Sequence, residues 1–404
     1  MKQKVIIIGQ GYSGRLSIAH SVGEIGCEVV IIALVPHNED GKTLYKKKPI
    51  DAYSKYVKQV YFCFQKDGDG IIRILLDKCK EKDSKPIIIP DNDFSAAIID
   101  KNKESLKDFF LFPYFKRDSE TVTDWMNKTK QKELAIQLGL NVASSTMVEI
   151  RNGKYTMPHS GVKYPCFAKP MMSIVGGKSG LKKCDNESEL RNHLDYMSKR
   201  NNLDVLLEDY KEIQQEYAVL GFSDGENVVI PGILKILKLA HGGHYGVAIQ
   251  GEVSSIPPEH KHIIEVFKKY ILTVGFVGIF DFDYYKSEDV LYFGELNLRF
   301  GGSGYAYTKM GVNLPAMFVR FLSGEQYKDM QKTINGSATY INERMLIDEW
   351  YDGYISKKEM DHLFNSSDIK FVASEEDLEP MRQMNKMIKI NQIKKFIKLC
   401  IGRK

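Results

Sequence analysis

The first hundred residues alternate short apolar runs with helical patterns. Runs rich in β-branched residues predict strands at 4–8, 28–34, 60–62 and 86–89, and the segments between them have the spacing of helices. Strands that alternate with helices form parallel sheets. We therefore expect a parallel α/β domain at the start of the chain.

The pattern changes from residue 164 onward to an alternation of apolar and polar positions with period two. Such alternation is typical of antiparallel strands with one covered face. It predicts strands at 166–169, 205–208, 217–221, 228–236 and 278–285, then a hairpin turn at 286–289 and a return strand at 290–298. A Lys-rich helical stretch at 124–146 precedes these strands, and after residue 314 the pattern becomes helical.

These patterns divide the chain into four parts. The fold class that they predict combines α/β and α+β. We predict an N-terminal parallel α/β domain over 1–115, and a linker helix with a small central subdomain over 116–210. A C-terminal lobe with an antiparallel sheet follows over 211–330, and a helical extension with a basic tail over 331–404.

Composition places the chain among soluble globular proteins. Hydrophobic residues make up 43% and charged residues 27% of 404 residues, and the net charge of +5 is mild for this size. We expect no nucleic-acid partner. The six cysteines show no ligand spacing, and no apolar run approaches the roughly 20 residues that span a bilayer. The expected location is the cytoplasm.

A glycine turn, Gly9-Gln10-Gly11-Tyr12-Ser13-Gly14, follows the first strand and fits the spacing GxGxxG. Its backbone amides would be able to approach a phosphate. A dinucleotide site also needs an acid at the end of the second strand, which here ends Ala33-Leu34-Val35-Pro36. We favour a tight turn that needs glycine, and an NAD-dependent oxidoreductase is the alternative of another class.

The return strand of the hairpin carries an acid, an amide and a guanidinium on one face: Glu295, Asn297 and Arg299. Across the hairpin, Asp281 and Asp283 share a face, and either could lie opposite Glu295. Hard oxygen ligands from two strands suit Mg²⁺ that also binds phosphates. The competing interpretation is a solvated sheet face with mixed charges.

A second feature is Lys169, which ends an apolar strand just before a loop that contains Ser173, Gly176, Gly177, Lys178 and Ser179. Such a loop can fold over a triphosphate, while the lysine supplies a fixed positive charge. Alone, this pattern would indicate an ordinary surface hairpin. The acidic hairpin downstream favours the phosphate site.

A set of landmarks occurs in order along the chain: Asn127-Lys128, Lys169 with its glycine loop, Glu208-Asp209-Tyr210, Glu216, Asp281 and Glu295-Leu296-Asn297-Leu298-Arg299. This ordered set resembles the landmarks of the ATP-grasp superfamily, and the resemblance covers residues 1–325. The resemblance implies that Lys128 and Lys169 contact the phosphates of ATP beneath the glycine loop. It also implies that Glu208, Asp209 and Tyr210 form the adenine-binding hinge, and that Glu216 binds the ribose.

By the same resemblance, Asp281, Glu295 and Asn297 hold two Mg²⁺ ions, with Mn²⁺ as a substitute, and Arg299 steadies the transferred phosphoryl group. Two aspartates stand where one acid is expected. The run Gly278-Ile279-Phe280-Asp281-Phe282 fits the family's strand better, so we favour Asp281 and keep Asp283 as the alternate.

Within the superfamily the chain looks most similar to carboxylate–amine ligases of the D-aspartate ligase, cell-wall and capsule branch. The stretches at 53–56, 91–93 and 294–302 carry this likeness. It implies ADP-forming amide synthesis through an acyl phosphate, joining an amino acid to a peptide, cell-wall or surface-polysaccharide acceptor. A bicarbonate-phosphorylating enzyme of the carboxylase or carbamoyl phosphate type is the runner-up.

The residues expected to meet the substrates are less sharply marked. They are Arg299, Gly301, Gly302, Ser303, Tyr305 and His244. Expected partners are a small-molecule carboxylate and an amine, together with a second copy of the chain in a homodimer. The tail from residue 380 alternates apolar and basic residues, which fits either a packed helix or an amphipathic helix at a membrane surface.

Overall fold

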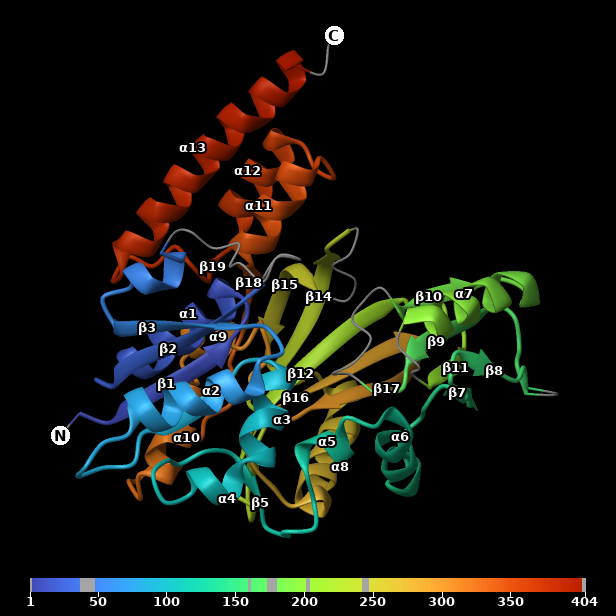
Figure 1. Ribbon diagram of the computed structural model, residues 1–404, viewed down its shortest axis with the longest axis horizontal. Coiled ribbons are helices and arrows are strands. Elements are labelled where there is room, and N and C mark those ends of the chain that lie inside the picture. The colour runs from blue at the N-terminus through green and yellow to red at the C-terminus, as the bar shows by residue number, and fades with distance from the viewer. Residues whose placement is uncertain are drawn as a thin grey trace.

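The computed structural model describes residues 2–36, 48–158, 161–172, 180–200, 204–241 and 247–401, with the backbone alone for residues 200 and 394–401. Three sheets carry the architecture (Figure 1). The N-terminal sheet lies at one end, the small central subdomain at the other, and the largest sheet runs between them. The C-terminal helices stand above the N-terminal sheet.

The N-terminal sheet is parallel, with strand order β3-β2-β1-β4, as the alternating pattern predicts. Its strands are β1 (Lys4–Gly9), β2 (Glu28–Val35), β3 (Val57–Phe64) and β4 (Ile87–Pro90). The helices around it are α1 (Tyr12–Gly23), α2 (Gly68–Ile74), α3 (Asp93–Lys101) and α4 (Lys103–Leu106). Residues 5–8 are fully buried, because helices cover both faces of a parallel sheet.

The central subdomain is a four-stranded sheet with order β10-β9-β11-β6. Its strands are β6 (Ser145–Val148), β9 (Cys166–Pro170), β10 (Lys182–Cys184) and β11 (Val205–Asp209), with α7 (Glu187–Arg200) against them and a hairpin of β7 (Ile150–Arg151) and β8 (Lys154–Tyr155) beside them. Two helices lead into it, α5 (Val122–Trp125) and α6 (Lys128–Gln137).

The largest sheet follows the order β17-β16-β12-β14-β15-β18-β19. Its first five strands are β12 (Gln215–Ser223), β14 (Ile233–Leu239), β15 (Ala248–Ser254), β16 (Phe276–Ser287) and β17 (Val290–Asn297), and β5 (Tyr114–Phe115) pairs with β16. The neighbouring helices are α8 (Lys261–Val274), α9 (Tyr305–Lys309) and α10 (Leu314–Leu322). The predicted antiparallel hairpin of β16 and β17 is confirmed.

Two details of the predicted pattern are wrong. The strand expected at 228–236 is interrupted, with β13 at Val228–Val229 and β14 starting at Ile233, because Pro231 lacks the N–H group that a ladder needs. The extension after residue 330 is also not purely helical. Besides α11 (Glu343–Asp352), α12 (Lys357–Ser366) and α13 (Leu378–Ile401), it supplies the strands β18 (Ser337–Ile341) and β19 (Ile369–Lys370).

A continuous core joins the N-terminal sheet to the largest sheet. It contains Val5 and Ile31 from the first and Leu220 and Val253 from the second. The extension is tied to the same body by a buried contact, in which Nε2 of His20 lies 3.0 Å from Oδ2 of Asp377.

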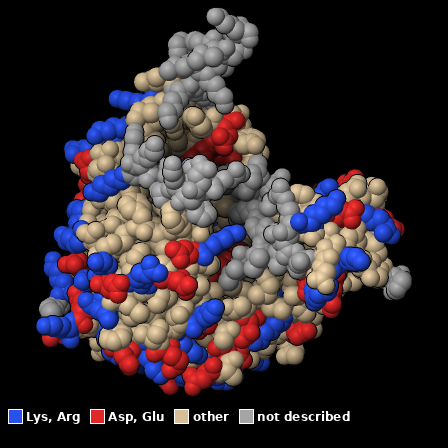
Figure 2. Space-filling view, viewed as in Figure 1, with Lys and Arg blue, Asp and Glu red and all other residues tan. Residues whose placement is uncertain are grey.

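The surface shows basic and acidic side chains interspersed over the face in Figure 2. Among the described residues, no helix is both long and apolar enough to cross a membrane. Near the start of α13, Met384 packs into a cluster with Leu16 and Ile50. The predicted membrane-facing tail from residue 380 includes residues 394–404, whose side chains lie outside the described set, so membrane contact stays a prediction.

Candidate active site

The hairpin of β16 and β17 brings the predicted polar side chains together on one face. In its register Asp283 lies opposite Glu295, and Asp281 lies opposite Asn297. Nδ2 of Asn297 donates a hydrogen bond to Oδ2 of Asp283 at 3.3 Å. The strand is irregular at Gly294, where an added Cβ would lie 2.7 Å from the carbonyl oxygen of Asp283. Glycine therefore permits the close approach of the two strands at the acids.

The carboxylates of this face repel one another in a buried setting. Burial, with the nearby charges of Asp281 and Glu295, raises the pKa of Asp283 well above its usual range. Burial also raises the pKa of Asp281 to about 6, although Arg299 opposes the shift. Oδ1 of Asp281 is buried without a hydrogen-bond partner in the described part of the chain. Such a cluster favours the arrival of a cation.

The donor set fits Mg²⁺ that is shared with phosphates. Among the described residues, no group of three Asp, Glu, His or Cys side chains converges closely enough to hold a metal by itself. Mg²⁺ characteristically takes one or two carboxylates and completes its shell with water and phosphate oxygens. Asp283 and Glu295, facing each other with Asn297 beside them, supply that number. Asp281 instead turns toward Arg299, with 3.6 Å between Oδ2 and Nη1.

Helix α6 places a lysine on the acidic face. Nζ of Lys128 lies 2.6 Å from Oε2 of Glu295. Burial opposes ionisation of Glu295, but Lys128 and Lys169 hold the pKa of this carboxyl below its usual range. Lys128 is the first residue of the helix, whose cap is Asn127 with Oδ1 accepting from the amides of Thr129 and Lys130. The cap thus fixes where the lysine points.

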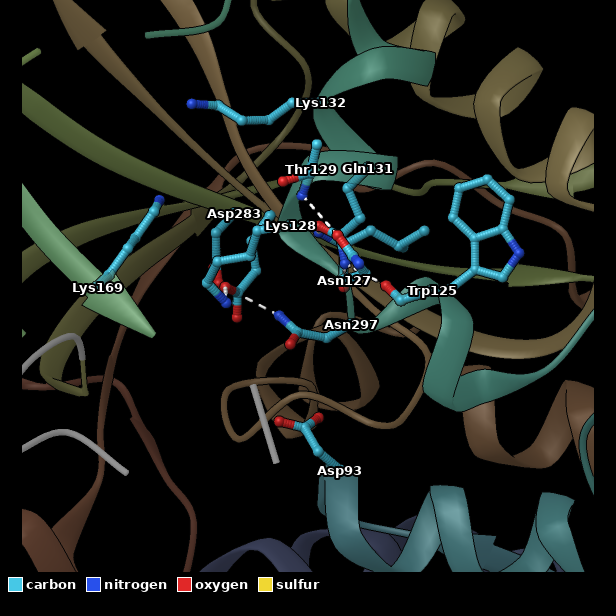
Figure 3. A network of polar contacts seen from close by, with 12 residues as sticks. Asp93, Trp125, Asn127, Lys128, Thr129, Gln131, Lys132, Lys169, Asp283 and Asn297 are labelled. Carbon is cyan, nitrogen blue, oxygen red and sulfur yellow. Dashed lines mark hydrogen bonds and ion pairs between the residues drawn. The ribbon is translucent and has the colours of Figure 1, made fainter. Parts of the chain in front are cut away.

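A second lysine cluster surrounds Glu208 on β11. Its two carboxylate oxygens lie 2.7 Å from Nζ of Lys169 on β9 and 2.7 Å from Nζ of Lys132 on α6. Figure 3 shows both lysines extending toward the same region. Burial raises and the lysines lower the pKa of Glu208, which ends below its usual range. The carboxylate of Glu208, a predicted hinge residue, is therefore paired with Lys169, the lysine that is predicted to contact the phosphates.

Sequence reasoning missed Lys132, although a signal was present. Lys132 follows Lys128 by four residues, which places both on one face of a helix. Both lysines are almost fully buried, with 6% and 8% of their surfaces exposed. Buried lysines of this kind require anionic partners, and each has one here.

A cavity of about 760 Å³ opens beside the predicted hinge at residues 208–210. Asp209, Tyr210 and Glu216 line it together with Lys169 and Tyr285. Ile213 and Leu237 add apolar surface, with 46% and 44% exposed. An apolar wall with acids at one side suits a flat base joined to a sugar.

A neighbouring cavity of about 600 Å³ holds the acids and the cations. Its lining includes Lys128, Asp281, Asp283, Glu295 and Arg299. Lys169 and Ile236 line both cavities, so the two are adjacent at these residues. A ligand with a base at one end and phosphates at the other would span them.

Comparison with known proteins gives a consistent result. No family model matches the chain. The large chain of carbamoyl phosphate synthase from Clostridium perfringens is 29% identical over 170 residues, which is 41% of this chain. The matched segment spans only 16% of the length of that relative.

Solved structures match over most of the chain. An L-amino acid ligase from Bacillus licheniformis covers 84% of this chain and 80% of its own, with a TM-score of 0.61 and 15% identity. The biotin carboxylase domain of 2-oxoglutarate carboxylase from Hydrogenobacter thermophilus, in complex with MgADP and bicarbonate, covers 84% and 74%, with a TM-score of 0.62 and 18% identity.

The protein has an ATP-grasp fold. The predicted fold class is thereby confirmed, with a parallel N-terminal sheet and further sheets that are mainly antiparallel. The matched proteins are ligases, synthetases and carboxylases. The narrower likeness to the D-aspartate ligase branch stays a prediction.

The predicted substrate residues separate into three groups. Gly302 and Ser303 line the acidic cavity. An added Cβ on Gly301 would lie 2.4 Å from Oδ2 of Asp281, so its role is close packing beneath the acids. Tyr305 is 1% exposed, and its ring packs against His20 and Phe371 in the core, away from the cavity. Contact between Tyr305 and a substrate stays a prediction, and its burial in this structure does not favour it.

The predicted glycine loop lies outside the described residues. Its predicted phosphate-binding residues are Ser173, Gly176, Gly177, Lys178 and Ser179. His244 lies outside the described residues as well. The residue before that second segment, His241, is described: its Nδ1 lies 2.7 Å from Oε2 of Glu349 on α11. The extension thus holds the end of β14 next to the cavity.

The GxGxxG turn of the N-terminal domain is filled by an acid. An added Cβ on Gly9 would lie 1.4 Å from Oδ1 of Asp91, and an added Cβ on Gly14 would lie 3.1 Å from Oδ2. The backbone of Gln10 donates to the same carboxylate, whose pKa burial raises to about 7. A carboxylate in this position opposes a phosphate on the turn. The glycines are explained by the close approach of Asp91.

Proposed function

We propose that the protein is an ATP-dependent ligase that activates a carboxylate as an acyl phosphate and joins it to an amine. The observation that carries the proposal is the pair of adjacent cavities that share Lys169. One offers an apolar wall and the acid Glu216, and the other gathers two lysines, an arginine and the acids of the β16–β17 hairpin. This order matches the order of base, sugar and phosphates along ATP.

The proposed reaction needs no covalent enzyme nucleophile. A carboxylate oxygen of the substrate attacks the γ-phosphorus of ATP, the bond to the β–γ bridging oxygen breaks, and ADP departs. The amine then attacks the acyl carbon, phosphate leaves with its bonding electrons, and the amine nitrogen loses a proton. Lys128, Lys169 and Arg299 would hold the negative charge in place during transfer.

Asp283, Glu295 and Asn297 would hold Mg²⁺, which supplies charge neutralisation for the phosphates when bound. We propose Asp283 in preference to Asp281, since Asp283 is the aspartate that faces Glu295 across the hairpin. Asp281 then forms an ion pair with Arg299. In the absence of a phosphate, Lys128 balances Glu295.

The carboxylate is proposed to be an amino acid and the acceptor a peptide, cell-wall or surface-polysaccharide amine. The similarity of the fold to an L-amino acid ligase supports an amino acid substrate. The acceptor class rests on the sequence resemblance alone.

Bicarbonate is the second candidate for the carboxylate. It is favoured by the 29% identity to the carbamoyl phosphate synthase chain and by the similarity to a structure that contains bicarbonate and MgADP. The lysines, acids and arginine of the cavity suit either substrate, because both present a carboxylate oxygen to the γ-phosphate.

The deciding experiment measures ADP release from Mg-ATP across amino acids, dipeptides and bicarbonate, with hydroxylamine added in parallel to trap acyl phosphates as hydroxamates. Substrate-dependent ADP release with a hydroxamate supports the ligase. Release that depends only on bicarbonate supports the second candidate.

Two variants sharpen this assay. Glu295→Ala is expected to abolish ADP release, and Glu265→Ala, an exposed acid on α8 paired with Lys268, is the matched control. No release with any substrate, together with no calorimetric binding of Mg-ADP, would show that the ATP-dependent proposal is wrong.

A further inference from the structure

Arg299 is held by acids from two different parts of the chain. Its Nε donates a hydrogen bond to Oδ1 of Asp93 at 3.0 Å, and its Nη1 lies 3.6 Å from Oδ2 of Asp281. Asp281 belongs to the same hairpin region as Arg299, whereas Asp93 is the first residue of α3 in the N-terminal domain. One side of the guanidinium is therefore set by a residue 206 positions away in the sequence.

Asp93 itself has little freedom. The preceding residue, Asn92, caps α3 by accepting from the amide of Ser95 at 2.8 Å. The hydroxyl of Ser95 donates to the carbonyl oxygen of Ile8 on β1 at 3.0 Å. These bonds fix the start of α3 to the carboxyl edge of the parallel sheet. Figure 3 shows Asp93 pointing from this helix toward Asn297.

The contact is electrostatically strong for a cavity residue. Asp93 and Arg299 both line the acidic cavity, and their side chains are only 24% and 20% exposed. Burial would lower the pKa of Arg299, but Asp93 and Asp281 together hold it above its usual range. Because the guanidinium is planar, a bond at Nε fixes the directions of all its remaining N–H groups.

We propose that Asp93 is a positioning residue that orients Arg299 toward the reacting phosphoryl group and makes this orientation depend on the seating of the N-terminal domain. The proposal rests on the proposed function, in which Arg299 steadies that group. An arginine attached only through its own lobe would sample several rotamers. Asp93 removes this freedom before the substrates arrive. A charge that is already oriented stabilises the transition state without a further cost of reorganisation.

The kinetic test uses Asp93→Asn, which keeps the shape and removes the charge, and Asp93→Glu, which keeps the charge. The matched control is Asp67→Asn, a helix-capping acid of the same domain that accepts from the amide of Gly70 at 2.8 Å. With the best substrate of the panel, Asp93→Asn should lower kcat about 10- to 100-fold, the range expected when a catalytic group is misplaced. KM for ATP should change less than about twofold, and Asp93→Glu should recover part of kcat.

A double-mutant cycle separates positioning from other roles of Asp93. In the Arg299→Ala background, Asp93→Asn should cause no further loss, because the group through which it acts is gone. An equal loss in both backgrounds would overturn the proposal and would favour direct recognition of a substrate amine by Asp93. A loss accompanied by a lower melting temperature for Asp93→Asn would favour a structural role.

A spectroscopic readout does not depend on turnover. The Nε–Hε resonance of Arg299 can be assigned in ¹⁵N-labelled protein by its disappearance in Arg299→Lys. It should shift in Asp93→Asn and stay in place in Asp67→Asn. An unchanged resonance in Asp93→Asn would overturn the proposal whatever the kinetics. If the unmodified protein shows no turnover while the resonance shifts, the proposed function fails and the contact stands.

Discussion

Gln131 on α6 binds both sides of the backbone of Leu296 on β17. Its Nε2 donates to the carbonyl oxygen of Leu296 at 2.8 Å, and its Oε1 accepts from the amide of the same residue at 2.9 Å. The side chain thus replaces a neighbouring strand at the edge of the sheet. Leu296 stands between Glu295 and Asn297, so this clasp sets the direction of both proposed metal ligands.

Replacing Gln131 with alanine should destabilise the protein and disturb the acidic face. Both backbone groups of Leu296 would lose their partner in a buried position, at a cost of about 2–4 kcal/mol. Chemical denaturation with urea measures the change. Gln137→Ala, an exposed position near the end of the same helix, is the control and should change stability by less than about 0.5 kcal/mol. Equal stability of the two variants would contradict the clasp.

Lys132→Met should weaken the binding of Mg-ATP. With Lys132 removed, Glu208 balances its charge with Lys169 alone and holds this lysine back from the phosphates. We expect about a tenfold higher Kd, which corresponds to about 1.4 kcal/mol. Titration calorimetry checks this. Lys130→Met is the control, since Lys130 pairs with Glu120 outside the two cavities; an equal effect of both variants would argue against the cluster.

Leu237→Glu should weaken nucleotide binding through the other cavity. Leu237 presents an apolar side chain to the proposed base site, and a carboxylate there would be desolvated by the base. About tenfold weaker binding of Mg-ADP is expected in the same calorimetric assay. Leu272→Glu, at a 41% exposed leucine on α8, should bind as the unmodified protein does. Unaltered binding by Leu237→Glu would place the base elsewhere.

Asp377 should make stability depend on pH in the acid range. Burial raises its pKa, but bonds from His20, Ser54 and the amide of Lys55 outweigh this and hold the pKa below that of a free aspartate, about 3.9. A lowered folded-state pKa adds stability above pH 3.9 that is lost as the pH falls through the folded value. Asp377→Asn should therefore melt at a lower temperature near neutral pH, and the difference should shrink below about pH 4.

The control for this pH series is Glu375→Gln, which changes an exposed acid two residues before Asp377. Its melting curve should follow that of the unmodified protein across the series. A difference between Asp377→Asn and the unmodified protein that stays constant from pH 7 to pH 3 would show that the ionised carboxylate contributes nothing.

The sequence by itself determined the kinds of sheet and the strand face that carries the proposed metal ligands. Buried parallel strands must be apolar along their whole length, as at 5–8. The parallel strands of the N-terminal domain could therefore be predicted from the sequence. Alternation with period two forces Glu295 and Asn297 to one side of β17. Both rules depend only on residues that are close in the sequence, so they hold whatever the distant segments pack against.

Tertiary structure decided which partners each side chain meets. Asp281 and Asp283 share a face, and only the hairpin register, shifted at Gly294, places Asp283 opposite Glu295. The pairing of Asp93 with Arg299 and the burial of Tyr305 depend on how distant segments pack. β18 likewise is five residues long and exists as a strand because β15 offers it an edge. Contacts between distant segments leave no periodic trace in the sequence, so packing alone selects them.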